Sequence, residues 1–119
     1  MTMELKDALL GDVPTLIAIG SVDETTCAAL ETALRERLEA RHNIVFLDLS
    51  EVDHMDRAGA SVLAAWVKAL GGKGWLGIIG PKADVRLVLE TEGLLPHPNV
   101  RLFETRHAAR MVTGERQST

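Results

Sequence analysis

The chain has 119 residues, which suits a single domain, because independently folding domains usually run to about 100–200 residues. Apolar residues make up 46% and charged residues 25%, so a core can form without a structural metal. The net charge of −4 divides into −5 over residues 1–50 and +1 over residues 51–119. An acidic chain with two tryptophans, two phenylalanines and one cysteine excludes a nucleic-acid binder and a disulfide framework.

The distribution of apolar residues bears on localisation and domain organisation. No apolar run approaches the length of about 18 residues that a membrane span needs, and the first residues do not resemble a signal peptide. We therefore expect a cytoplasmic protein without direct membrane insertion. We expect one domain over residues 1–112, followed by a polar C-terminal tail over residues 113–119.

Short strands and amphipathic helices alternate along the chain. The expected strands cover residues 5–10, 15–19, 44–49, 75–79 and 100–103. The expected helices cover residues 24–41, 57–70 and 81–92, with a last helix after Thr105. This order predicts an α/β domain with a mostly parallel or mixed sheet of four to five strands and about four helices packed against it.

The first helix has a clear apolar face. Cys27, Leu30, Leu34 and Leu38 recur at three- and four-residue spacing, so Cys27 is predicted to be an inert thiol in the core. Asp23 precedes the helix and is predicted to be its N-cap, because a carboxylate can accept hydrogen bonds from the free amides of the first turn.

Two loops follow carboxyl ends of expected strands, where α/β sheets bind ligands and partners. They cover residues 20–23 and 53–59, and four aspartates lie in or beside them: Asp23, Asp48, Asp53 and Asp56. These acids could hold magnesium for phosphoryl transfer, or act as helix caps and solvated loop acids, which is the interpretation we favour. Since the sequence offers no nucleophile–base pair and no metal-ligand cluster, we expect neither an enzyme nor a cofactor.

Arg57 is the least expected residue in these loops. It follows Asp56 at the start of the second helix, where the helix dipole disfavours a cation. One interpretation is an arginine that points into water or pairs with Asp23 or Asp56. The other is a recognition residue on an exposed loop.

Four segments in the expected order resemble those of the STAS domain family. Residues 20–23 (GSVD) resemble the turn into its first helix, and residues 44–50 (IVFLDLS) resemble its central strand. Residues 56–63 (DRAGASVL) resemble its signature Asp-Ser-Ser-Gly-Leu-Gly-Val-Leu, and residues 80–94 resemble the strand end, helix and turn that follow. The similarity spans about residues 4–112, nearly the whole chain.

The resemblance implies a non-catalytic module that binds an anti-sigma factor or a kinase-like partner. In that family the first serine after the signature aspartate is phosphorylated, which breaks the partner contact. Here Arg57 occupies that position and Ala58 follows it, so neither can accept a phosphate. The implied partner-binding residues are Asp23, His54, Asp56, Arg57, Ala58, Gly59 and Ala60.

Two other roles stay open at this point. The chain could be a STAS subunit or scaffold of a transporter or signalling complex, which needs no phosphate switch. Alternatively, Arg57 at a helix start could bind a nucleotide or another anion weakly. The apolar stripes are all needed for the core, so we expect a monomer or a weak dimer.

Overall fold

A computed structural model describes the backbone of residues 2–40 and 42–117, and the side chains within these ranges up to residue 112. The strands are β1 (Met3–Leu10), β2 (Val13–Val22), β3 (Ile44–Met55), β4 (Trp75–Ile79) and β5 (Val100–Phe103). The helices are α1 (Cys27–Glu39), α2 (Arg57–Leu70), α3 (Ala83–Thr91) and α4 (Arg106–Gln117). The predicted alternation of strands and helices is confirmed. Within the described residues, no helix has the length and apolar character needed to cross a membrane.

The five strands form one mixed sheet in the order β1-β2-β3-β4-β5. The β1–β2 hairpin is antiparallel, and every other neighbouring pair is parallel. Each parallel pair is joined through a helix, as crossover connections require. The predicted α/β class with a mostly parallel or mixed sheet is therefore confirmed.

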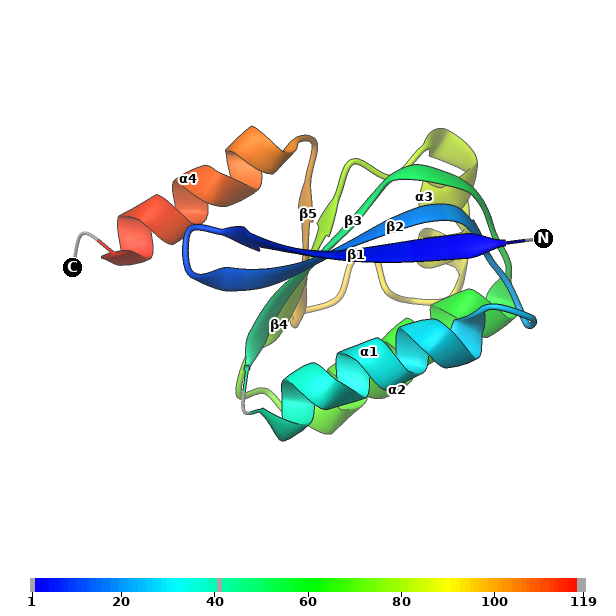
Figure 1. The fold of residues 1–119 in the computed structure, drawn as a ribbon, viewed down its shortest axis with the longest axis horizontal. Helices are drawn as coiled ribbons and strands as arrows, with labels where there is room; N and C mark the ends of the chain where they lie inside the picture. The colour runs from blue at the N-terminus through cyan, green and yellow to red at the C-terminus, as the bar shows by residue number, and fades with distance from the viewer. Residues whose placement is uncertain (1, 41, 118–119) are drawn as a thin grey trace.

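The helices divide between the two faces of the sheet. Figure 1 shows α1 and α2 side by side below the sheet and α4 across the opposite face. The main core lies on the α1–α2 side and also includes Val85 and Leu89 of α3. A smaller cluster lies on the α4 side and comprises Val13, Phe46, Ile79 and Ala109. Both faces of β3 are thus covered, which explains its nearly continuous apolar sequence.

The third strand is longer than predicted. Residues 50–55, expected to be loop, continue β3 to Met55 and pair with the end of β2. Val52 and Met55 are buried in the main core, whereas Glu51 and Asp53, on either side of Val52, are exposed. The acids suggested a loop, but on a strand with one solvated face they occupy outward positions.

The first helix starts later than predicted, at Cys27, and its N-cap residue is Thr26 rather than Asp23. The Asp23 carboxylate instead accepts hydrogen bonds from the amide and hydroxyl of Thr25, which hold residues 24–26 in a turn. Cys27 therefore lies in the first helical turn, half-buried, and its thiol donates to the Glu24 carbonyl at 3.7 Å. The prediction of a core thiol is wrong, whereas Leu30 and Leu34 are fully buried as predicted.

The C-terminal helix extends beyond the predicted domain end. Thr105 accepts a hydrogen bond from the Ala108 amide at 3.1 Å, which confirms it as the residue that caps this helix. The backbone then stays helical to Gln117, within the segment expected to be a polar tail. The rest of that tail, residues 118–119, lies outside the described residues.

Candidate docking site at the ends of β2 and β3

The two predicted loops meet in one corner of the sheet. Ser21 of β2 pairs with His54 of β3, and Val22 pairs with Met55. The Asp56 amide then donates to the Val22 carbonyl at 3.1 Å, so the chain leaves β3 in contact with the end of β2. We call this region the docking corner; it comprises residues 21–25 and 54–60.

Asp56 organises the corner through both carboxylate oxygens. One accepts from the Gly59 amide at 3.1 Å, which makes Asp56 the N-cap of α2. The other accepts from the Glu24 amide at 3.3 Å, across to the turn that precedes α1. The interpretation of Asp56 as a helix cap is confirmed. Its oxygens are engaged with backbone amides, so its part in the corner is structural.

Gly59 lets α2 approach the end of β2. A Cβ atom at this position would lie 2.6 Å from Cγ1 of Val22 and 2.9 Å from the Val22 carbonyl oxygen. Real Cβ atoms do not approach other atoms so closely, so the contact requires glycine. Gly59 and Ala60 are both buried, and they place the exposed residues around them.

Asp23 is largely buried at the end of β2 and fixes the neighbouring turn. The Thr25 hydroxyl donates to its carboxylate at 2.6 Å and the Thr25 amide at 2.9 Å. The Thr25 hydroxyl is the main cause that lowers the pKa of Asp23, against an opposing effect of burial. The Thr26 hydroxyl donates to the Ser21 carbonyl at 2.8 Å and closes the turn.

Arg57 and His54 are the exposed members of the predicted set, with Ala58 half-buried beside them. The Arg57 side chain is 84% exposed, and its Nε lies 3.3 Å from a carboxylate oxygen of Glu92. Glu92 follows α3 and is only 20% exposed. The interpretation that Arg57 pairs with Asp23 or Asp56 is therefore wrong: the partner is Glu92, which sequence spacing could not single out because it lies far along the chain.

The four acids considered for a metal site do not converge. Asp23 and Asp56 lie in the docking corner, whereas Asp53 pairs with Lys82 at 2.6 Å. Asp48 lies on the α4 face of the sheet, where it binds Ser50 and Arg106. No group of three or more His, Cys, Asp or Glu side chains in the described part of the chain is arranged to hold a metal ion.

A five-stranded mixed sheet with helices on both faces and this corner at the ends of two parallel strands defines the class of α/β domain. The matching family model is described as "Mlab, STAS domain" and covers residues 5–96. The chain belongs to the STAS domain family, as its four motifs predicted.

Known relatives agree with this assignment. The anti-sigma-F factor antagonist RsfB of Mycobacterium tuberculosis is 32% identical over 97 residues, which are 82% of this chain and 76% of RsfB. An anti-sigma factor antagonist from Mycobacterium paratuberculosis has the same fold, with a TM-score of 0.80 at 22% identity over 94% of this chain and 93% of that structure. Unphosphorylated SpoIIAA, an anti-sigma factor antagonist, aligns with a TM-score of 0.68 at 13% identity over 95% and 99%. The chain is accordingly a regulatory STAS domain related to anti-sigma factor antagonists.

Proposed function

We propose that this chain is a cytoplasmic, non-catalytic antagonist that binds an anti-sigma factor or a kinase-like protein through the docking corner. The observation that carries the proposal is Arg57, which is exposed at the start of α2 and anchored by Glu92. The likeness to RsfB supports the class of partner. Asp23, Asp56, Gly59 and Ala60 act by holding the corner in shape, whereas Arg57, His54 and Ala58 face the partner.

In this proposal the contact is not switched by phosphate at residue 57. A phosphoserine would bring a charge of about −1.5 to −2 to the helix start, where Arg57 brings +1. The Arg57 side chain has no hydroxyl, so a kinase cannot break the contact there. The complex is then controlled by the amounts of the two proteins, unless another hydroxyl accepts phosphate.

A binding measurement tests the site. The tagged chain is used to isolate its anti-sigma or kinase-like partner from the native host, and affinity is then measured by calorimetry with the two purified proteins. Arg57→Glu should weaken binding by about tenfold or more, because it reverses an exposed interface charge. Lys73→Glu, an exposed residue just beyond the opposite end of α2, is the matched control. Equal affinity for wild type and Arg57→Glu would refute the docking corner as the binding site.

A phosphorylation assay tests the absence of a switch. The chain is incubated with the purified kinase-like partner and ATP, and modified residues are located by mass spectrometry. We expect no phosphate at the start of α2. Thr25 and Ser61 are exposed hydroxyls in or beside the corner, and stoichiometric phosphate on either would show that the switch has moved rather than disappeared.

A second candidate is a STAS subunit or scaffold of a transporter or signalling complex. Arg57 at the position of the family's phosphorylated serine also favours this candidate. A permanent subunit needs no phosphate acceptor, and Arg57 cannot accept a phosphate. Isolation of membrane-transport components in place of an anti-sigma factor would support this candidate. The docking corner would still be the expected contact, so Arg57→Glu would again weaken the complex.

A third candidate, weak nucleotide or anion binding, depends on Arg57 at the start of α2. Its Nε is already engaged with Glu92, and both carboxylate oxygens of Asp56 accept from backbone amides nearby. Calorimetry with ATP, GTP and inorganic phosphate tests this candidate, and no heat at millimolar ligand would eliminate it.

A further inference from the structure

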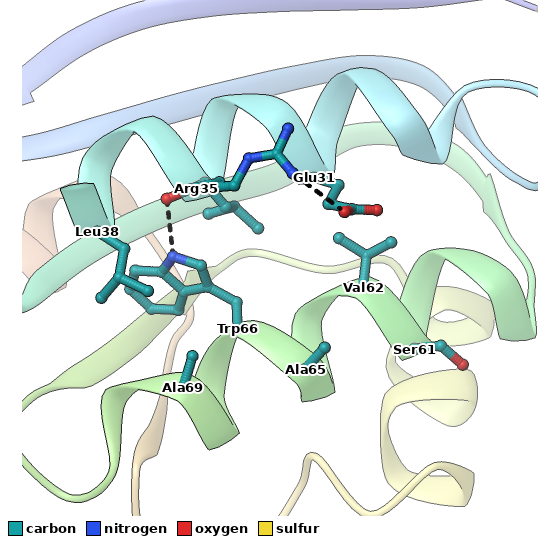
Figure 2. A pocket seen from close by; sticks show the side chains of 9 residues that line it. Glu31, Arg35, Leu38, Ser61, Val62, Ala65, Trp66 and Ala69 are labelled. Carbon is teal, nitrogen blue, oxygen red and sulfur yellow. Dashed lines mark hydrogen bonds and ion pairs between the residues drawn. The ribbon is translucent and has the colours of Figure 1, made fainter.

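A groove separates the outer faces of α1 and α2 and begins at Ser61, next to the docking corner. It has a volume of about 450 Å³ and a mainly apolar lining. Its α1 wall is formed by Glu31, Leu34, Arg35 and Leu38, and its α2 wall by Ser61, Val62, Ala65, Trp66 and Ala69. Figure 2 shows Glu31 and Arg35 extending from α1 on one side, with Ala65 and Ala69 on the helix opposite.

The groove is held open by a rigid contact. The Trp66 indole N–H donates to the Leu34 carbonyl at 2.8 Å, which ties α2 to the backbone of α1. Trp66 is 5% exposed and Leu34 is fully buried, so the floor belongs to the main core. The hollow is therefore a fixed feature of the surface.

The α2 wall lacks the charges expected of a solvated helix face. Ser61, Ala65 and Ala69 are exposed, yet from Ala58 to Val67 the helix carries no charged residue. Solvent-facing helix positions are usually polar or charged. Small side chains at successive turns also let a second helix approach closely. Both properties indicate that another helix covers this face.

The charges on the α1 wall suit a second copy of the same chain. Glu31 and Arg35, one helical turn apart, form an ion pair at 3.7 Å, and among the described residues that line the groove they are the only charged ones. A two-fold axis passing between them places Glu31 of each copy opposite Arg35 of the other. Such an interface is self-complementary, as a symmetric dimer requires.

We propose that two copies of this chain associate through their α1–α2 grooves as a two-fold symmetric dimer. The Glu31 and Arg35 pairs lie at the axis, and the apolar residues of both walls pack around them. Arg57, His54 and Ala58, which face the partner in the proposed function, do not line the groove and stay accessible in this arrangement. The dimer is therefore independent of the proposed partner contact.

Sedimentation velocity over the micromolar to low millimolar range tests the dimer. We expect reversible dimerisation of the wild-type chain. Glu31→Arg and Arg35→Glu should each raise the dissociation constant by about tenfold or more, because like charges then face each other across the axis. The exchange of both residues, E31R/R35E, should restore it to within about threefold, because opposite charges face each other again.

Mixing the two single variants separates an interface role from a structural one. In a mixed dimer, the two arginines of the Glu31→Arg chain face the two glutamates of the Arg35→Glu chain. The mixture should therefore associate more tightly than either variant alone, although neither chain has regained its own ion pair. Ala65→Arg fills the groove at an exposed position and should abolish the dimer without disturbing the core.

The ion pair between Arg86 and Glu90 on α3 provides a matched control. It has the same spacing, at 3.8 Å, and both residues are absent from the groove lining. Arg86→Glu and Glu90→Arg should leave the dissociation constant unchanged. A chain that stays monomeric throughout the range would overturn the proposal. So would a dimer that tolerates Ala65→Arg, or single variants that fail to rescue each other.

Discussion

Two sites on the sheet each combine an aspartate with the arginine that begins a helix, yet they differ in burial. One is the docking corner; the other, which we call the α4 corner, comprises Asp48, Ser50 and Arg106 on the α4 face. In the docking corner, Asp56 binds backbone amides, and Arg57 is 84% exposed beside Glu92. On the α4 face, Asp48 is 1% exposed and binds Arg106 directly. On the α4 face the aspartate and arginine thus hold the start of a helix against the sheet. In the docking corner the arginine is exposed to solvent.

The α4 corner is a closed network. The Asp48 carboxylate accepts from the Ser50 amide at 2.9 Å and from the Ser50 hydroxyl at 2.6 Å, and it also binds Nε of Arg106. Arg106 is the first residue of α4, so the network fixes the start of that helix against the sheet. Removing one partner of a buried pair destabilises a protein because the other group loses its compensation, whereas truncating an exposed pair costs little.

The largest expected effect is that of Asp48→Ala. It removes a buried acceptor and leaves the Ser50 amide and Arg106 without their partner, so we expect a loss of about 3 kcal/mol in the free energy of unfolding. Urea unfolding followed by tryptophan fluorescence measures it. Asp53→Ala, which removes an exposed partner of Lys82, should leave the urea midpoint almost unchanged. Equal effects of the two substitutions would contradict a stabilising role for the buried Asp48 network.

Gly59→Ala should be the next most damaging change. The added methyl group would overlap Val22, at 2.6 Å from its Cγ1, and must displace either α2 or the end of β2. We expect a loss of about 2 kcal/mol, typical of overpacking. Ser61→Ala, two residues along the same helix at an exposed position, is the control and should be close to neutral. A Gly59→Ala chain as stable as wild type would contradict the close approach.

Acid should reduce the stability that the α4 corner contributes to the fold. Burial alone would raise the pKa of Asp48, but the hydrogen bonds from Ser50 and the Arg106 charge together hold it below its ordinary value of 3.8. A folded-state pKa below the unfolded one stabilises the protein at higher pH, and that contribution disappears as the pH falls through the folded value. The gap in urea midpoint between wild type and Asp48→Asn should narrow below pH 3.8. A gap that stays constant would contradict the network.

Local patterns predicted most of the fold but little of the site's contacts. Apolar spacing placed α2 over Arg57–Leu70, and the run at residues 44–49 identified the central strand. Both features depend on neighbours in sequence. The extension of β3 to Met55 depends on pairing with β2, which no local pattern reports.

The same limit applies to individual side chains. Asp48 was grouped with Asp23 and Asp56 because all three lie near the predicted strand ends, but alternation along β3 turns it to the opposite face of the sheet. Glu92 and Arg106 were not predicted as partners, because each meets its counterpart only after the chain has folded. The groove between α1 and α2 also escaped prediction, although the uncharged stretch of α2 was a signal for it.

The smallest expected changes in the free energy of unfolding are those of Arg106→Ala and Arg57→Ala, and the difference between them is the most informative result. Arg106→Ala leaves the Asp48 carboxylate buried without its cation, so we expect a loss of about 1.5 kcal/mol. Arg57→Ala removes an arginine that is itself 84% exposed from its pair with Glu92 and should cost less than about 0.5 kcal/mol. Urea unfolding of both variants measures the difference, and a Glu92→Gln chain controls for the pair. If Arg57→Ala proved the more damaging, Arg57 would be a structural residue, and its exposure would no longer support a role in binding.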